Sequence, residues 1–261
     1  MPATNDLSFE IRLRLLPPDQ GGRPLPISDG YRPLWNLGNT WLGRPTQNDG
    51  TLFLDGIATL TPGAEGPALL VPLFEEFWAT LEVGAVLAMH EGARVVGYAS
   101  VTKVRRAAHF TREAAAFALQ AKQFCKFLET CSELPLPERL RSVRDLLVAL
   151  YAAGCALPRG VAADEIEAGP NPPPPAGWPG FERFELYWMV FDPYADEAPV
   201  AGELSDDLLD IYYDVSRGLE LWKSPATRAA ALWEWRFHFD VHWGAHAVQA
   251  MNALHRACAS G

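Results

Sequence analysis

The segment WEWRFHFDVHWGAHA, from Trp233 to Ala247, places His238, His242 and His246 four residues apart. Imidazoles at this spacing share one face of a helix, where two neighbouring rings can bind one metal ion. The outer rings are about 12 Å apart along an unbroken helix, whereas zinc–nitrogen bonds are only about 2 Å long. The spacing therefore allows His242 and His246 to bind one metal ion as a pair and excludes three ligands on one ion.

Acidic residues earlier in the chain could complete such a site. Asp206, Asp210 and Asp214 recur every four residues along one stripe of a predicted helix. The candidate ligands for a divalent metal are therefore Asp210, His242 and His246. Two other interpretations stay open: buried imidazoles that bond to acids or carbonyls and fix helix register, and catalytic groups. A metalloprotease is excluded, because no glutamate follows the first histidine of either pair.

The segment from Asp192 to Asp214 contains eight acids and no base. Such a run forms a solvated surface, a docking surface for a basic partner, or a set of metal ligands. Its spacing does not fit an EF-hand. The partner-binding residues predicted on the helix are Asp206, Asp207, Asp210 and Asp214.

Other catalytic motifs are missing from the sequence. It has no GxxxxGK[ST] phosphate loop, which excludes GTP hydrolysis, and no GxSxG elbow. No cofactor is predicted, and a divalent metal at the His/Asp site stays open as the alternative. The four cysteines form no CxxC pair, the polar start lacks a signal peptide, and no apolar stretch is long enough for a membrane span. We therefore expect a cytoplasmic protein that is not embedded in a membrane.

The charge is unevenly distributed along the chain. The net charge is −10; residues 1–106 hold nine basic and eleven acidic residues, and the remainder holds thirteen basic and twenty-one acidic residues. The negative charge therefore lies mostly in the C-terminal part. It argues against binding nucleic acid or anionic membranes through bulk attraction and favours a basic protein partner.

The hydrophobic period divides the chain into two parts. Residues 8–106 show period-two strands separated by turn residues, whereas the period from Thr111 onward is 3.6. The predicted fold is α+β: an antiparallel β-barrel in 1–106, then a helical bundle in 107–261 with a Pro-rich acidic loop at about 159–180. The last helix, 224–259, is expected to be unbroken, apolar on two sides and enclosed by its neighbours.

The strand half carries a sequence pattern in GGRPLPISDGYRPLW and VGAVLAMHEGARVVGYASVTKV. It resembles the third, C-terminal β-barrel domain of elongation factor Tu, with Gly30–Pro33 at the family's GYRP element. The resemblance implies a binding surface that includes Tyr31 and Arg32, and tRNA as a ligand only by analogy. His90 and Ala93 depart from the family's arginine and second glycine, and the GTPase domain is missing.

The helical half contains FDPY, LSDDL and a closing WEWRF segment followed by HWGAHA. It resembles a bacterial helical domain family of unknown function, which supplies no catalytic residues. The sequence thus favours a non-catalytic bacterial protein that binds a protein partner, either a translation-linked adaptor or an immunity-type protein that neutralises a toxin. The alternative is a metal-dependent enzyme that uses the His/Asp site.

Overall fold

The structure is a computed structural model that describes residues 6–107, 110–158, 174–175 and 177–260. The chain forms two compact units, Met1–Ala115 and Ala116–Gly261. The strands end at Arg106, where the sequence changes period, while the division between the units falls in the first turn of the following helix.

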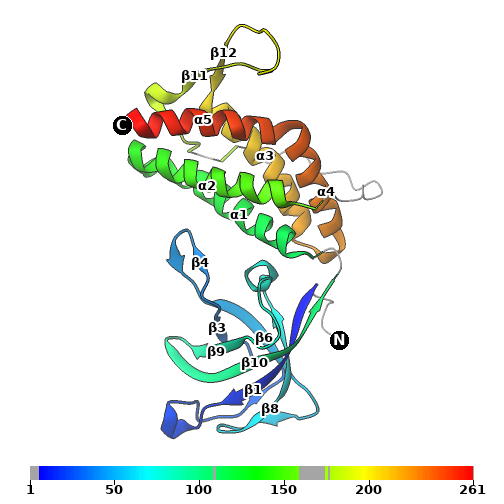
Figure 1. Cartoon of the computed structure of the whole chain (residues 1–261). Helices are drawn as coiled ribbons and strands as arrows, with labels where there is room; N and C mark the ends of the chain where they lie inside the picture. The colour runs from blue at the N-terminus through cyan, green and yellow to red at the C-terminus, as the bar shows by residue number, and fades with distance from the viewer. Residues whose placement is uncertain (1–5, 108–109, 159–173, 176, 261) are drawn as a thin grey trace. The chain divides into compact units, whose positions relative to one another are not determined.

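The first unit contains a closed antiparallel barrel with the strand order β1-β10-β9-β3-β6-β8 (Figure 1). The barrel strands are β1 (Leu7–Leu15), β3 (Leu34–Asn36), β6 (Asn48–Leu54), β8 (Glu65–Pro72), β9 (Val86–Glu91) and β10 (Arg94–Arg106). Two short ribbons accompany it: β2 (Ile27–Ser28) with β7 (Thr59–Leu60), and β4 (Thr40–Trp41) with β5 (Arg44–Pro45). The predicted barrel is confirmed.

The barrel core follows from the alternation of apolar residues along the strands. In β1 every second side chain points inward and is buried, as expected when one face of a strand meets the core. Trp35 of β3 and Trp78 fill the interior, with ring centroids 6.4 Å apart in an edge-on arrangement. Aromatic rings of this size each bury a large apolar area and therefore stabilise the barrel core.

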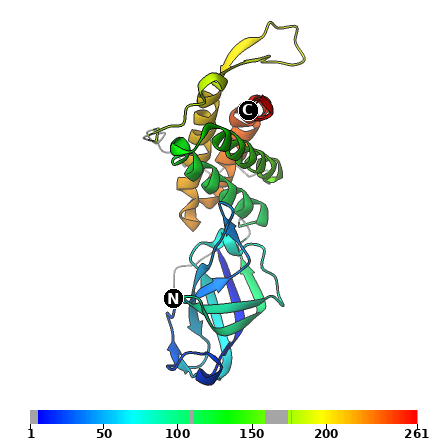
Figure 2. The ribbon, with the colours of Figure 1, turned by 90° about the vertical axis from the view of Figure 1, so that its left-hand side faces the viewer.

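The second unit is helical, which confirms the predicted α+β class. Its described elements are α1 (Arg112–Leu128), α2 (Leu136–Ala156), β11 (Leu186–Met189), β12 (Val200–Glu203), α3 (Leu204–Trp222), α4 (Arg228–His238) and α5 (Gly244–Ser260). α3 packs against both α4 and α5, and α2 packs against α5 (Figure 2). Most of the predicted Pro-rich loop lies outside the described residues. None of the described helices combines the length and apolarity needed to cross a membrane.

The prediction of one unbroken final helix is wrong. A π-helical turn, Phe239–Trp243, separates α4 from α5, and the two helices run in different directions (Figure 1). The turn depends on Gly244, because a Cβ atom there would lie 2.3 Å from the carbonyl oxygen of Phe239.

The final segment is also less enclosed than its two apolar sides predicted. Phe237, Val241 and Val248 are 43%, 60% and 49% exposed, so the second apolar side faces solvent. The opposite side meets α3, and there the histidines contact the carboxylates.

Candidate metal centre

Three carboxylates of α3 face the histidine-bearing segment. Asp207, Asp210 and Asp214 are three and four residues apart and therefore share one face of the helix. Asp207 and Asp214 are only 6% and 4% exposed, whereas the Asp210 side chain is 35% exposed. Because a buried charge without a partner is costly, the two buried carboxylates need donors, and the histidines supply them.

Each buried carboxylate holds one imidazole. His242 Nδ1 lies 2.6 Å from Asp214 Oδ2, and His246 Nδ1 lies 2.7 Å from Asp207 Oδ1. A carboxylate accepts a hydrogen bond, so the network assigns the proton of each ring to Nδ1. Metal-binding histidines are commonly oriented in this way, with the second nitrogen bonded to a carboxylate. Nε2 is therefore the nitrogen that each ring can offer to a ligand.

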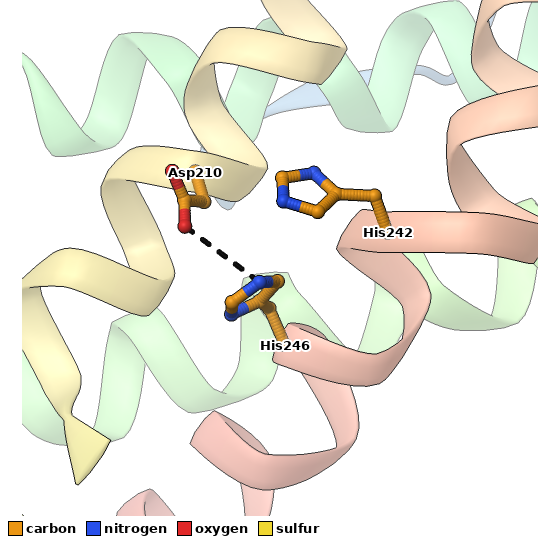
Figure 3. A group of neighbouring side chains, drawn as sticks. All are labelled: Asp210, His242 and His246. Carbon is orange, nitrogen blue, oxygen red and sulfur yellow. Dashed lines mark ion pairs between the residues drawn. The ribbon is translucent and has the colours of Figure 1, made fainter.

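Asp210 faces these two rings. His246 Nε2 lies 3.6 Å from Asp210 Oδ2, and one ligand atom from each of Asp210, His242 and His246 falls within 4.8 Å of the others. Figure 3 shows the three side chains turned toward one another from opposite helices. Ligand atoms around a tetrahedral zinc ion are about 3.3 Å apart, given bonds of about 2 Å. Small side-chain movements would therefore bring all three onto one ion.

The imidazole rings are not enclosed. The side chains of His242 and His246 are 43% and 27% exposed. They are therefore not the fully buried imidazoles that one interpretation of the sequence expected to fix the helix register. A cation held here would have protein ligands on one side and solvent on the other. Such an open arrangement is typical of catalytic metal sites, which keep a position for water.

A second group of potential ligands, Asp214, His238 and His242, already contains a cation. The guanidinium of Arg217 donates to Asp214 Oδ1, and its Nη2 lies 3.2 Å from His238 Nε2. His238 Nε2 is also 3.2 Å from Glu234 Oε2. Since Arg217 supplies positive charge where a metal would lie, this group orients Asp214 and does not compete for an ion.

A hydrogen bond and burial are the main causes of the pKa shifts in the centre. The hydrogen bond to Asp207 raises the pKa of His246 above its usual value, although burial acts in the opposite direction. Burial is the main cause that raises the pKa of Asp210, and the carboxylates of Asp206 and Asp214 add to it. Both shifts favour the protonated form of the group that they affect.

Sequence reasoning missed the residues that support the ligands. The hydroxyl of Tyr187, on β11, donates to Asp207 Oδ2, and burial and this bond raise the pKa of Tyr187. Arg217 and Glu234 are also part of the network, and helical spacing could have indicated both. Arg217 lies three residues after Asp214, and Glu234 lies four before His238. Nothing in the local sequence pointed to Tyr187.

The predicted partner-binding residues differ in their exposure to solvent. Asp206 is exposed and Asp210 half-buried, but Asp207 and Asp214 are buried because they hold the imidazoles. Only Asp206 and Asp210 can therefore present charge to a partner. The other two predicted residues belong to the barrel unit.

In the barrel, Arg32 is exposed, whereas the Tyr31 side chain is engaged by its neighbours. The Tyr31 hydroxyl donates to Glu91 Oε1 at 2.5 Å, and the Arg23 guanidinium lies 4.5 Å from the centre of the Tyr31 ring. Burial and the Glu91 bond raise the pKa of Tyr31. Of this pair, Arg32 is the residue whose side chain reaches solvent.

Comparison with known proteins finds similarity in sequence and in structure. Residues 180–260 match the family model described as "Domain of unknown function (DUF5063)", a range that includes all three candidate ligands and their supporting residues. The crystal structure of protein BF1032 from Bacteroides fragilis is similar at 19% sequence identity and a TM-score of 0.47. That match covers 57% of this chain and 97% of the other. The helical unit thus contains a region that matches the DUF5063 domain.

Proposed function

We propose that the helical unit binds one divalent transition-metal ion through Asp210 and Nε2 of His242 and His246. The observation that carries the proposal is the convergence of three ligand atoms within 4.8 Å, with both Nδ1 atoms already bonded to buried carboxylates. Two imidazoles and one carboxylate suit zinc, iron or manganese. With three protein ligands and a solvent-exposed side, the ion would keep a position for water. Bound water of this kind can have a pKa of about 7, so a zinc ion held by Asp210, His242 and His246 would supply a hydroxide nucleophile suited to hydrolysis.

The test is zinc binding by the whole chain after chelation and buffer exchange. Titration calorimetry and elemental analysis are expected to give one equivalent of zinc for the unmodified protein. Asp210→Ala and His246→Ala each remove a ligand and should lose this equivalent. His255→Ala is the matched control, because His255 is an exposed histidine on the same helix. Wild-type-like zinc binding by His246→Ala would overturn the proposal, as would the absence of binding by the unmodified protein.

A second candidate function is binding to a protein partner without catalysis, as a translation-linked adaptor or an immunity-type protein. The closed six-stranded antiparallel barrel and the exposed Arg32 support it, since the resemblance to elongation factor Tu implies a binding surface there. A photo-crosslinking amino acid at position 32 should capture one protein in bacterial cells. The same group at Asp55, another exposed barrel position, should not. Identical adducts from both positions would exclude this surface.

A further inference from the structure

The β11–β12 ribbon exposes more large apolar side chains than its own fold requires. Leu186, Trp188, Phe191 and Tyr194 are 69%, 74%, 75% and 98% exposed. The ribbon extends away from the helices (Figure 2). A two-stranded ribbon is marginally stable alone, and exposed apolar groups of this size mark interaction sites.

A groove of about 680 Å³ runs along one edge of this ribbon. Tyr187, Trp188 and Met189 of β11 and Val190 directly after it line the groove, although side chains of a strand alternate between the two faces. The groove therefore runs along β11 and continues to the tip of the ribbon, where Phe191, Pro193 and Pro199 complete its lining. Its other wall is α5, through Ala245, Val248 and Asn252. β12 pairs with one edge of β11, and no other described strand pairs with the second edge.

The charge around the groove is polarised. From Leu186 to Asp206 the chain has five acids and no base, and Asp192, Asp196 and Glu197 lie in the exposed tip of the ribbon. At the opposite end, Arg183 and Arg256 line the adjoining hollow beside Leu186. A ligand that lies along the strand would meet negative charge at the tip and positive charge at the base.

We propose that this groove binds an extended peptide segment of a partner protein, which adds as a strand to the free edge of β11. Main-chain hydrogen bonds to the edge provide affinity, and side-chain pockets between β11 and α5 select apolar residues. The segment carries lysine or arginine at the end that lies over the acidic tip. A second copy of this chain that paired in the parallel direction would bring two acidic tips together, and an antiparallel copy is the alternative that the sedimentation test below distinguishes. The proposal concerns a surface other than the metal ligands and does not depend on zinc.

The test is selection of a phage-displayed library of random twelve-residue peptides on the immobilised whole protein. The enriched peptides should alternate apolar residues in their centre and carry basic residues at one end. Trp188→Ser should weaken the binding of the best synthetic peptide by at least about tenfold, as expected for an aromatic anchor that becomes buried on binding. Asp196→Lys with Glu197→Lys should weaken it similarly.

The matched control is Asp19→Lys with Asp55→Lys, which makes the same change in net charge at exposed positions of the barrel unit. It should leave peptide affinity unchanged. The proposal is overturned if no peptide is enriched, or if the enriched peptides bind the ribbon variants and the unmodified protein equally. Sedimentation that shows a dimer lost on Trp188→Ser would also overturn it, in favour of a second copy.

Discussion

At the scale of single residues, the candidate site is a pair of imidazoles held by two buried carboxylates. Asp207 and Asp214 make short contacts to Nδ1 of His246 and His242, at 2.7 Å and 2.6 Å. Neither carboxylate is a proposed ligand, but each fixes the direction in which the other ring nitrogen points. Their contribution should therefore appear in metal affinity even though they do not touch the ion.

Asp207→Asn tests this orienting role. The asparagine side chain has no negative charge, so it accepts a weaker hydrogen bond from His246 Nδ1. Zinc affinity should therefore fall by about 10–100-fold. Asp206→Asn is the control, because Asp206 is the exposed neighbour in the same helical turn. Titration calorimetry measures both. Equal affinities for the two variants would show that Asp207 serves only the packing of α3.

The raised pKa of His246 makes a second prediction at this scale. In the metal-free protein the contribution of His246 to stability is fully present below its ordinary pKa of 6.5 and is lost as pH rises through its higher folded value. Zinc must displace that proton, so zinc affinity should rise over the same window above 6.5. Denaturant unfolding and calorimetry between about pH 6 and 8.5 measure the two opposite trends. Unchanged trends in His246→Ala would assign them to another group.

The sequence predicted the three candidate ligands but not their surroundings. The i, i+4 spacing of His242 and His246 and the aspartates of the preceding helix were visible as helical patterns. Tyr187 was not, because its contact with Asp207 depends on how a distant ribbon packs on α3. The burial of Asp207 could not be separated from the exposure of Asp206, since adjacent acids at a helix start look alike in sequence.

At the scale of elements, the close packing of α3 against α4 positions Asp214 beside its histidines. Gly218 of α3 permits this approach: an added Cβ atom would lie 2.0 Å from Nε1 of Trp235. That indole nitrogen donates to the carbonyl of Val215 at 3.0 Å, which joins the two helices. A larger residue at 218 must therefore displace the tryptophan or separate the helices.

Gly218→Ala should lower the free energy of unfolding by about 1–3 kcal/mol, the usual cost of overpacking a core. Ser216→Ala, a half-buried position two residues earlier in the same helix, serves as the control. Urea unfolding followed by tryptophan fluorescence provides the measurement. Comparable stability of the two variants would mean that α3 and α4 can move apart at no cost.

The π-helical turn shows where sequence periodicity stops being informative. Residues 224–259 keep a helical pattern throughout, so nothing in the period indicates the extra residue inserted at Phe239–Trp243. Tertiary packing and not local sequence determines the turn, and the absence of a side chain at Gly244 permits it. The rings of His242, in this turn, and His246, just after it, are accessible to solvent and not sealed between helices.

At the scale of the whole molecule, the chain combines a barrel of low net charge with an acidic helical unit. The change from strands to helices was predictable, because the apolar period switches from two to 3.6 at the end of β10. The position of the division between the two compact units was harder to predict. It falls at Ala115, inside α1, where local propensity does not change. The function of each unit depends on sites that only the tertiary structure assembles.

Zinc should stabilise one unit and not the other. A ligand that binds only the folded state at 100 times its Kd adds about 2.7 kcal/mol to stability, and here the ligands lie wholly within Ala116–Gly261. Hydrogen exchange followed by mass spectrometry should show slower exchange in α3 and α5 on zinc addition, with the barrel strands as the internal control. Equal protection of both units would contradict a site confined to the helices.

The most direct measurement is a crystal structure of the zinc-loaded protein with anomalous data collected on both sides of the zinc absorption edge. We predict one anomalous peak at about 2.0–2.2 Å from a carboxylate oxygen of Asp210 and from Nε2 of His242 and His246. Loaded crystals with no peak at this position, or with the peak between Asp214 and His238 instead, would contradict the proposed centre.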